Sequence, residues 1–66
     1  MTLREMRMAA GLTQWKAAEL IGCSDRVISW WERGKGTPRM RWVPLIAMTY
    51  GVSTIDVLQA MMEARK

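Results

Sequence analysis

Two short helical patterns joined by a tight turn, between Thr13 and Gly34, constrain the fold of this chain more than any other stretch. Thr13 and Ser24 suit the N-cap position, where a hydroxyl group accepts a hydrogen bond from a free N–H of the first helical turn. Gly22 can end the first helix in the left-handed conformation that costs glycine least. Ala18 is small enough to let two helices cross closely, so this stretch predicts two helices packed against each other across a sharp turn.

The second of these helices, over residues 24–33, has an apolar side and a polar side. Ile28 and Trp31 lie three residues apart, so they share the side that packs against the first helix. The outward side carries Asp25, Arg26, Ser29, Trp30 and Arg33. Such a pair is a helix-turn-helix, a motif that presents its second helix to the major groove of DNA. The sequence therefore predicts that this outward side binds double-stranded DNA.

The stretch and its flanks resemble the lambda-repressor-like family, the Cro/cI or XRE type of helix-turn-helix protein. The resemblance is carried by Leu3, Arg7, Gly11-Leu12-Thr13-Gln14, Ala18, Gly22, Ser24, Ile28-Ser29, Trp31-Glu32, Gly34-Lys35, Pro38, Ile46-Ala47, Tyr50-Gly51-Val52-Ser53 and Leu58. It implies an all-α fold, with one compact five-helix domain over residues 1–66 and the helix-turn-helix at Thr13–Gly34. It also implies a phage or bacterial transcription regulator, Cro-like or repressor-like, that binds an inverted-repeat operator as a weak homodimer.

The net charge and the types of residue present limit the functions that this chain can have. Ten Lys and Arg against six Asp and Glu give a net charge of +4, which favours a polyanionic partner such as nucleic acid. With no histidine and one cysteine, the chain cannot assemble a zinc site or a catalytic triad. We therefore expect no enzymatic activity, no cofactor, no metal and no small-molecule ligand. The longest apolar run, Trp42–Met48, is too short for a membrane span, and no signal peptide is visible, so we expect a cytoplasmic protein.

Four side chains on the outward side are candidates for contact with base edges. Arg26 can donate two hydrogen bonds to guanine, although a phosphate contact or a solvated arginine is the alternative. Asp25 can accept from cytosine N4 or instead stabilise the helix N-terminus. Trp30 can pack on thymine methyl groups or on the sugar edge, or belong to a protein-binding patch. Ser29 can donate or accept a hydrogen bond and predicts no particular base.

A second group of side chains is predicted to contact phosphates. The resemblance implies that Gln14, in the first turn of its helix, clamps a phosphate beside the free N–H groups. The other candidates are Arg33, Lys35, Thr37, Arg39 and Arg41. Any single member of this basic loop can equally be a solvated side chain. The resemblance also implies that Arg7 and Glu32 form a structural salt bridge between the first and third helices.

The start of the fourth helix is ambiguous in the sequence. Thr37 and Pro38 suit an N-cap and a first helical position, but Pro44 would interrupt a helix that began there. We expect a late or distorted start, with regular helix from about Trp42–Val43.

The main alternative to DNA binding is a protein-interaction module, such as an antitoxin or a phage or host adaptor, that reuses the same fold. Trp15, Leu20 and Trp42 favour it, because the family commonly has polar residues at these positions. The same apolar surplus is compatible with self-association, for which Met61 and Met62, or Trp42 and Leu45, are the candidate contacts.

Overall fold

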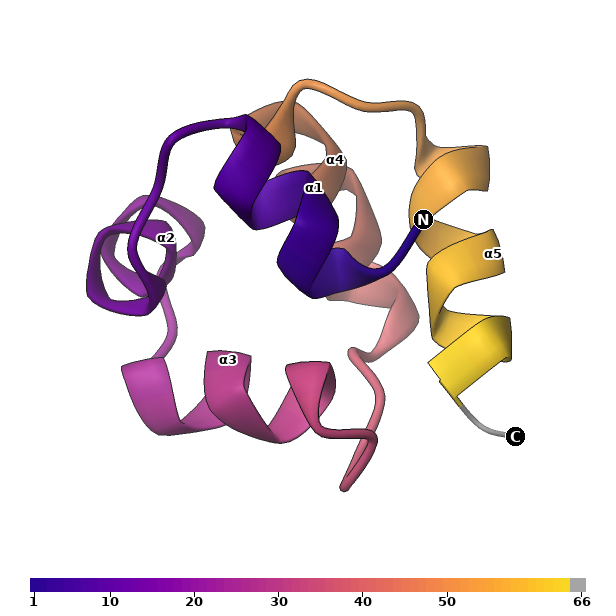
Figure 1. Ribbon diagram of the computed structural model, residues 1–66, viewed down its shortest axis with the longest axis horizontal. Helices are drawn as coiled ribbons and strands as arrows, with labels where there is room; N and C mark the ends of the chain where they lie inside the picture. The colour runs from indigo at the N-terminus through magenta and orange to yellow at the C-terminus, as the bar shows by residue number, and fades with distance from the viewer. Residues whose placement is uncertain (65–66) are drawn as a thin grey trace.

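The computed structural model describes residues 1–64, which form five α-helices and one short 3₁₀ helix (Figure 1). The elements are α1 (Leu3–Ala9), α2 (Gln14–Ile21), α3 (Asp25–Glu32), η1 (Met40–Trp42), α4 (Val43–Tyr50) and α5 (Thr54–Ala64). The expected all-α fold with five α-helices is confirmed.

Hydroxyl side chains fix the starts of the first three helices, and the sequence predicts the second and third of these starts, at Thr13 and Ser24. The Glu5 backbone N–H donates to Thr2 Oγ1 at 3.1 Å and the Thr2 N–H donates to Glu5 Oε1 at 2.8 Å, which completes a capping box at α1. Thr13 accepts from a backbone N–H of α2 at 3.0 Å, and Ser24 accepts from one of α3 at 3.3 Å. Each cap satisfies a donor that the helix itself leaves free.

The junction of α2 and α3 depends on a small residue and a left-handed glycine. Gly22 adopts a φ of 97°, and its N–H and that of Cys23 both donate to the Ala18 carbonyl, at 2.8 and 3.0 Å. Ala18 is only 3% exposed. Figure 1 shows α2 end-on while α3 lies across the view below it, and the two helices are in contact.

The remaining helices build the core on which α3 rests. The largest side chains that are almost completely buried are Met6, Ile28, Ile46 and Val57, one from each of α1, α3, α4 and α5. Trp31, a turn after Ile28, is also buried and packs against the Trp42 ring with the centroids 6.4 Å apart. The inner side of α3 is thereby fixed, and its outer side remains open.

The fourth helix starts late, as expected from Pro44. Residues 37–39 are not helical, η1 covers Met40–Trp42, and α4 runs from Val43. Pro44 is then the second residue of α4, where its missing N–H breaks no intrahelical hydrogen bond. The start that Thr37 and Pro38 suggest does not occur, and Pro38 is buried instead.

Between residues 1 and 64, no single helix is long and apolar enough to cross a membrane. The segments Met40–Tyr50 and Thr54–Ala64 reach that length and composition only when taken together, across a bend of 114°.

Candidate nucleic-acid interface

The outer side of α3 combines cationic, polar and aromatic side chains. Asp25, Arg26, Trp30 and Arg33 are exposed and Ser29 is half-buried. The helix proper spans Asp25–Glu32, with Ser24 and Arg33 as its caps, so its extent agrees with the predicted 24–33. These five side chains lie on one open surface, and their contacts with bases or phosphates stay predictions.

Trp30 lies where α3 meets the following loop. Its ring carbon Cε3 is 3.8 Å from where a Cβ at Gly36 would be, and the Lys35 backbone N–H donates to the Trp30 carbonyl at 3.0 Å. The Trp30 residue is nevertheless 57% exposed. The loop therefore supports the ring from one side and leaves most of it available to a partner, which is compatible with either predicted role.

Arg7 and Glu32, which the resemblance pairs, form a nearly buried ion pair in the structure. Arg7 Nε donates to Glu32 Oε2 at 2.6 Å and Nη2 donates to Oε1 at 3.1 Å. Arg7 Nη1 also donates to the Leu12 carbonyl at 2.8 Å, which ties in the loop before α2. The hydrogen bonds to Glu32 raise the pKa of Arg7 above its ordinary value. This pair fixes the end of α3 relative to α1 and to the start of α2.

Glu32 also binds the first residue of α2, which sequence reasoning did not anticipate. Gln14 Nε2 donates to Glu32 Oε1 at 3.1 Å, the same oxygen that accepts from Arg7 Nη2. Both residues were singled out in the sequence, but no spacing rule connects positions 14 and 32. The phosphate contact of Gln14 stays a prediction. The structure adds that the hydrogen bond to Glu32 fixes the position of this amide.

The loop after α3 presents most of its basic side chains to solvent. Lys35, Arg39 and Arg41 are exposed, while Thr37 is half-buried. The Arg41 guanidinium carbon lies 5.5 Å from the centroid of the Trp42 ring, within cation–π range. Within residues 1–64, the ion pairs involve only Met1, Arg7 and Lys16 as cations, so the loop cations and those of α3 are not neutralised by a carboxylate there.

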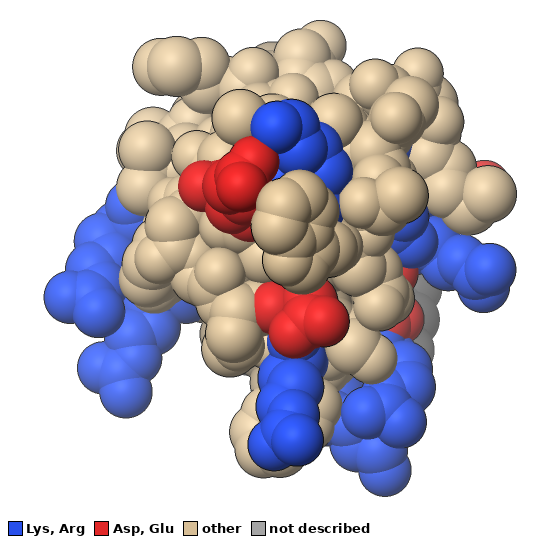
Figure 2. Space-filling model, turned by 90° about the vertical axis from the view of Figure 1, so that its left-hand side faces the viewer, with Lys and Arg blue, Asp and Glu red and all other residues tan. Residues whose placement is uncertain are grey.

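The distribution of charge agrees with a basic lower side of the molecule. Figure 2 shows lysine and arginine side chains projecting mainly from the lower part, the level at which Figure 1 places α3 and its following loop. Two groups of acidic atoms lie nearer the centre of that view. A polyanion approaching from below would meet mostly cations.

Asp25 contributes to a hollow beside the turn between α2 and α3. The hollow, of about 290 Å³, is lined by Trp15, Ala18, Glu19, Cys23, Ser24 and Asp25. Partial burial raises the pKa of the Cys23 thiol, which makes the reactive thiolate scarcer near neutral pH. The thiol therefore suits a packing role rather than a reactive one, and Asp25 lies at the flank of the α3 surface.

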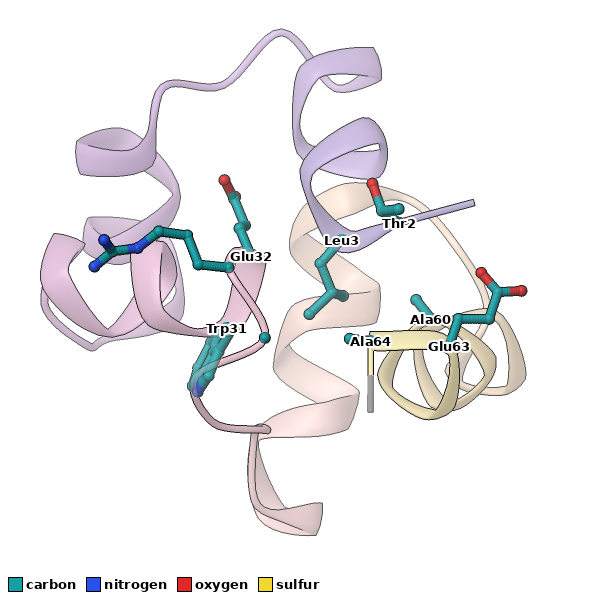
Figure 3. Close-up of a pocket in the computed structure, with 9 residues that line it drawn as sticks. Thr2, Leu3, Trp31, Glu32, Ala60, Glu63 and Ala64 are labelled. Atoms are coloured by element: carbon teal, nitrogen blue, oxygen red, sulfur yellow. The ribbon is translucent and has the colours of Figure 1, made fainter. Parts of the chain in front are cut away.

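A second hollow, of about 200 Å³, lies between the C-terminal end of α3, the start of α1 and the end of α5 (Figure 3). Three of its polar side chains already have partners: Thr2 caps α1, Glu32 binds Arg7, and Glu63 lies 3.7 Å from the Met1 ammonium, while Arg33 is exposed to solvent. Gly34 closes this region, since a Cβ there would meet the Ala64 carbonyl oxygen at 3.1 Å. We interpret this hollow as part of the packing between helices.

Across residues 1–64, no three or more His, Cys, Asp or Glu side chains are grouped so that they could hold a metal ion.

Comparison with known proteins identifies one matching family. A family model described as a helix-turn-helix domain matches residues 1–61. No curated protein and no solved structure matches the chain. The matched range contains all the side chains of the surface described above.

Proposed function

The chain belongs to the helix-turn-helix domain family, whose members typically bind DNA without catalysing a reaction, and we propose that it is a sequence-specific transcription regulator. The observation that carries the proposal is the division of α3 into two sides. Ile28 and Trp31 are buried in the core, whereas Arg26, Trp30 and Arg33 face solvent without a carboxylate partner among residues 1–64.

In this proposal α3 lies in the major groove of double-stranded DNA. Arg26 donates two hydrogen bonds to a guanine, and Trp30 packs on a thymine methyl group or on the adjacent sugar. Ser29 and Asp25 add contacts at the edges of the same surface. Gln14, Arg33, Lys35, Thr37, Arg39 and Arg41 hold phosphates on either side and so set the orientation of the helix.

One short helix reads few base pairs, so we propose that two copies bind an inverted repeat as a weak homodimer. Their recognition helices would lie about 34–36 Å apart, which is one turn of DNA. A Cro-like or repressor-like regulator in a phage or bacterial cytoplasm fits this arrangement. We assign no enzymatic activity to the domain.

A protein-interaction module is the second candidate, because two large apolar side chains of α2 are exposed. Trp15 is 63% exposed and Leu20 is 53% exposed. An antitoxin or adaptor would use such side chains to bind another protein, and the net charge of +4 would then be incidental.

Electrophoretic mobility on random duplex DNA at two salt concentrations separates the two candidates. We expect a retarded complex at low salt that weakens steeply at the higher salt, because phosphate contacts release counterions. A folded protein that leaves the mobility of the DNA unchanged at both salt concentrations would contradict the DNA-binding proposal and favour the interaction module.

A further inference from the structure

The outer side of α4 is uncharged and exposed. None of the eight residues of α4 carries a charge. Its buried side consists of Val43, Ile46, Ala47 and Tyr50, so Pro44, Leu45 and Met48 face solvent. Met48 is 80% exposed, more than any other large apolar side chain in residues 1–64, and Leu45 is 42% exposed.

A hollow opens on this same side at the start of the helix. It measures about 200 Å³ and is lined by Arg41, Trp42 and Leu45, with largely apolar walls. The stacking of Arg41 on Trp42 forms one wall. A projecting methionine and an apolar hollow thus lie one helical turn to either side of Leu45, because Trp42 precedes Leu45 by three residues and Met48 follows it by three.

We propose that this face, defined by Arg41, Trp42, Leu45 and Met48, is where a second copy of the chain docks. When two α4 helices pack antiparallel with the two-fold axis at Leu45, residue 48 of one copy lies opposite residue 42 of the other. Met48 of each copy then enters the hollow of its partner. Flexible methionine side chains fill irregular apolar spaces well.

The chemistry of the face favours a second copy over a different partner. It offers no carboxylate and only one cation at its edge, so a charged partner would find little to complement it. A second copy, by contrast, supplies both the projecting methionine and the apolar hollow that the two faces need to fill each other. The residues of the face belong to η1 and α4, the elements that follow the loop after α3 (Figure 1). None of the residues that define the face belongs to α3, so this docking does not itself use the outer side of α3.

The size of the face sets the strength of the association. A stable interface buries about 1,200–2,000 Å² in total, and four side chains per copy fall short of that. The dimer is therefore weak in free solution and is strengthened when both copies bind one DNA. This last consequence rests on the proposed function, whereas the docking itself does not.

Sedimentation equilibrium of the full chain over a wide concentration range tests the interface. We compare the wild type with Met48→Glu and with the control Met62→Glu, which adds the same charge at a methionine of α5 that is 69% exposed. A glutamate in the apolar hollow loses its hydration, so association weakens about tenfold or more in Met48→Glu and is unchanged in Met62→Glu. Equal association of all three proteins would overturn the proposal.

Disulfide crosslinking tests whether the two-fold axis lies at Leu45, even where association is weak. In a Cys23→Ser background, Leu45→Cys forms a disulfide-linked dimer on oxidation faster than Ile55→Cys, whose parent residue is exposed on α5. If Leu45→Cys crosslinks no faster than Ile55→Cys, the two-fold axis does not lie at Leu45. Electrophoretic mobility of random duplex DNA with the same variants separates the docking proposal from the proposed function. We expect Met48→Glu still to bind DNA. A protein that dimerises but does not bind DNA contradicts only the proposed function.

Discussion

Arg26 is the side chain whose surroundings best fit direct reading of a base. It lies in the first turn of α3, it is exposed, and it has no ion-pair partner among residues 1–64. Asp25 next to it borders the hollow beside the α2–α3 turn, so the two neighbours face different surroundings. Sequence specificity should therefore depend more on Arg26 than on Asp25.

Replacing Arg26 by alanine should weaken binding to the preferred site by about 1–3 kcal/mol and relax the preference at one base pair of each half-site. Titrations on the preferred site and on single-base variants measure both effects. Arg4→Ala removes an equal charge from an exposed position of α1 and should leave the preference unchanged. An Arg26→Ala protein that keeps the full sequence preference would show that Arg26 contacts a phosphate or solvent only.

Gln14 gives a different prediction, because Glu32 holds its amide and a phosphate contact carries no sequence information. Gln14→Ala should weaken binding similarly on all sequences. Because the Gln14 amide is uncharged and releases no counterion, its loss should leave the dependence of log affinity on log salt unchanged, whereas Arg39→Ala and Arg41→Ala should each flatten that dependence by about one. Gln59→Ala, at an exposed position of α5, serves as the control. A lower melting temperature with unchanged affinity for DNA would mean that Gln14 has only a structural role.

At the scale of the elements, the closeness of α2 and α3 depends on Ala18, which is 3% exposed. Ala18→Leu should destabilise the domain by about 1–3 kcal/mol, because an enlarged side chain forces the two helices apart. Thermal unfolding followed by circular dichroism measures the change. Ala9→Leu makes the same substitution at an exposed alanine of α1 and should have little effect. If both variants melt like the wild type, the two helices do not meet at Ala18.

The helices themselves were largely predictable from local chemistry. Thr13 and Ser24 mark helix starts that the structure reproduces, because a cap acts within its own first turn. Pro44 likewise signalled the late start of α4 by removing an N–H that a longer helix would need. The hydrogen bond from Gln14 to Glu32 was not predictable, since it joins residues 18 positions apart whose distance depends on the packing of whole helices.

The candidate site also has features that local sequence predicts and features that depend on the packing of the whole chain. Which side of α3 faces outward follows from the spacing of Ile28 and Trp31, so the exposed residues could be named from the sequence. The hollow next to Leu45 and the stacking of Arg41 on Trp42 depend on how η1 joins α4. No local pattern encodes that junction, and only the folded chain brings these side chains together.

At the scale of the whole molecule, one core supports two proposed binding surfaces, the outer side of α3 and the uncharged side of α4. The Arg7–Glu32 ion pair fixes α3 against α1, while the same core positions α4 with its uncharged side outward. If the two surfaces cooperate, a pair of copies presents two α3 helices to DNA in a fixed relation. The DNA sequence that the protein prefers should then record both the surface of α3 and the two-fold arrangement.

Selection of bound duplexes from a random DNA pool tests the central claim, sequence-specific binding by the outer side of α3, most directly. For the wild type we expect enrichment of an inverted repeat whose half-site centres lie about one DNA turn apart. The same selection with Arg26→Ala should keep the repeat and lose one preferred base pair in each half. A pool that stays random after repeated rounds with a folded protein, or an Arg26→Ala selection identical to that of the wild type, would contradict the claim.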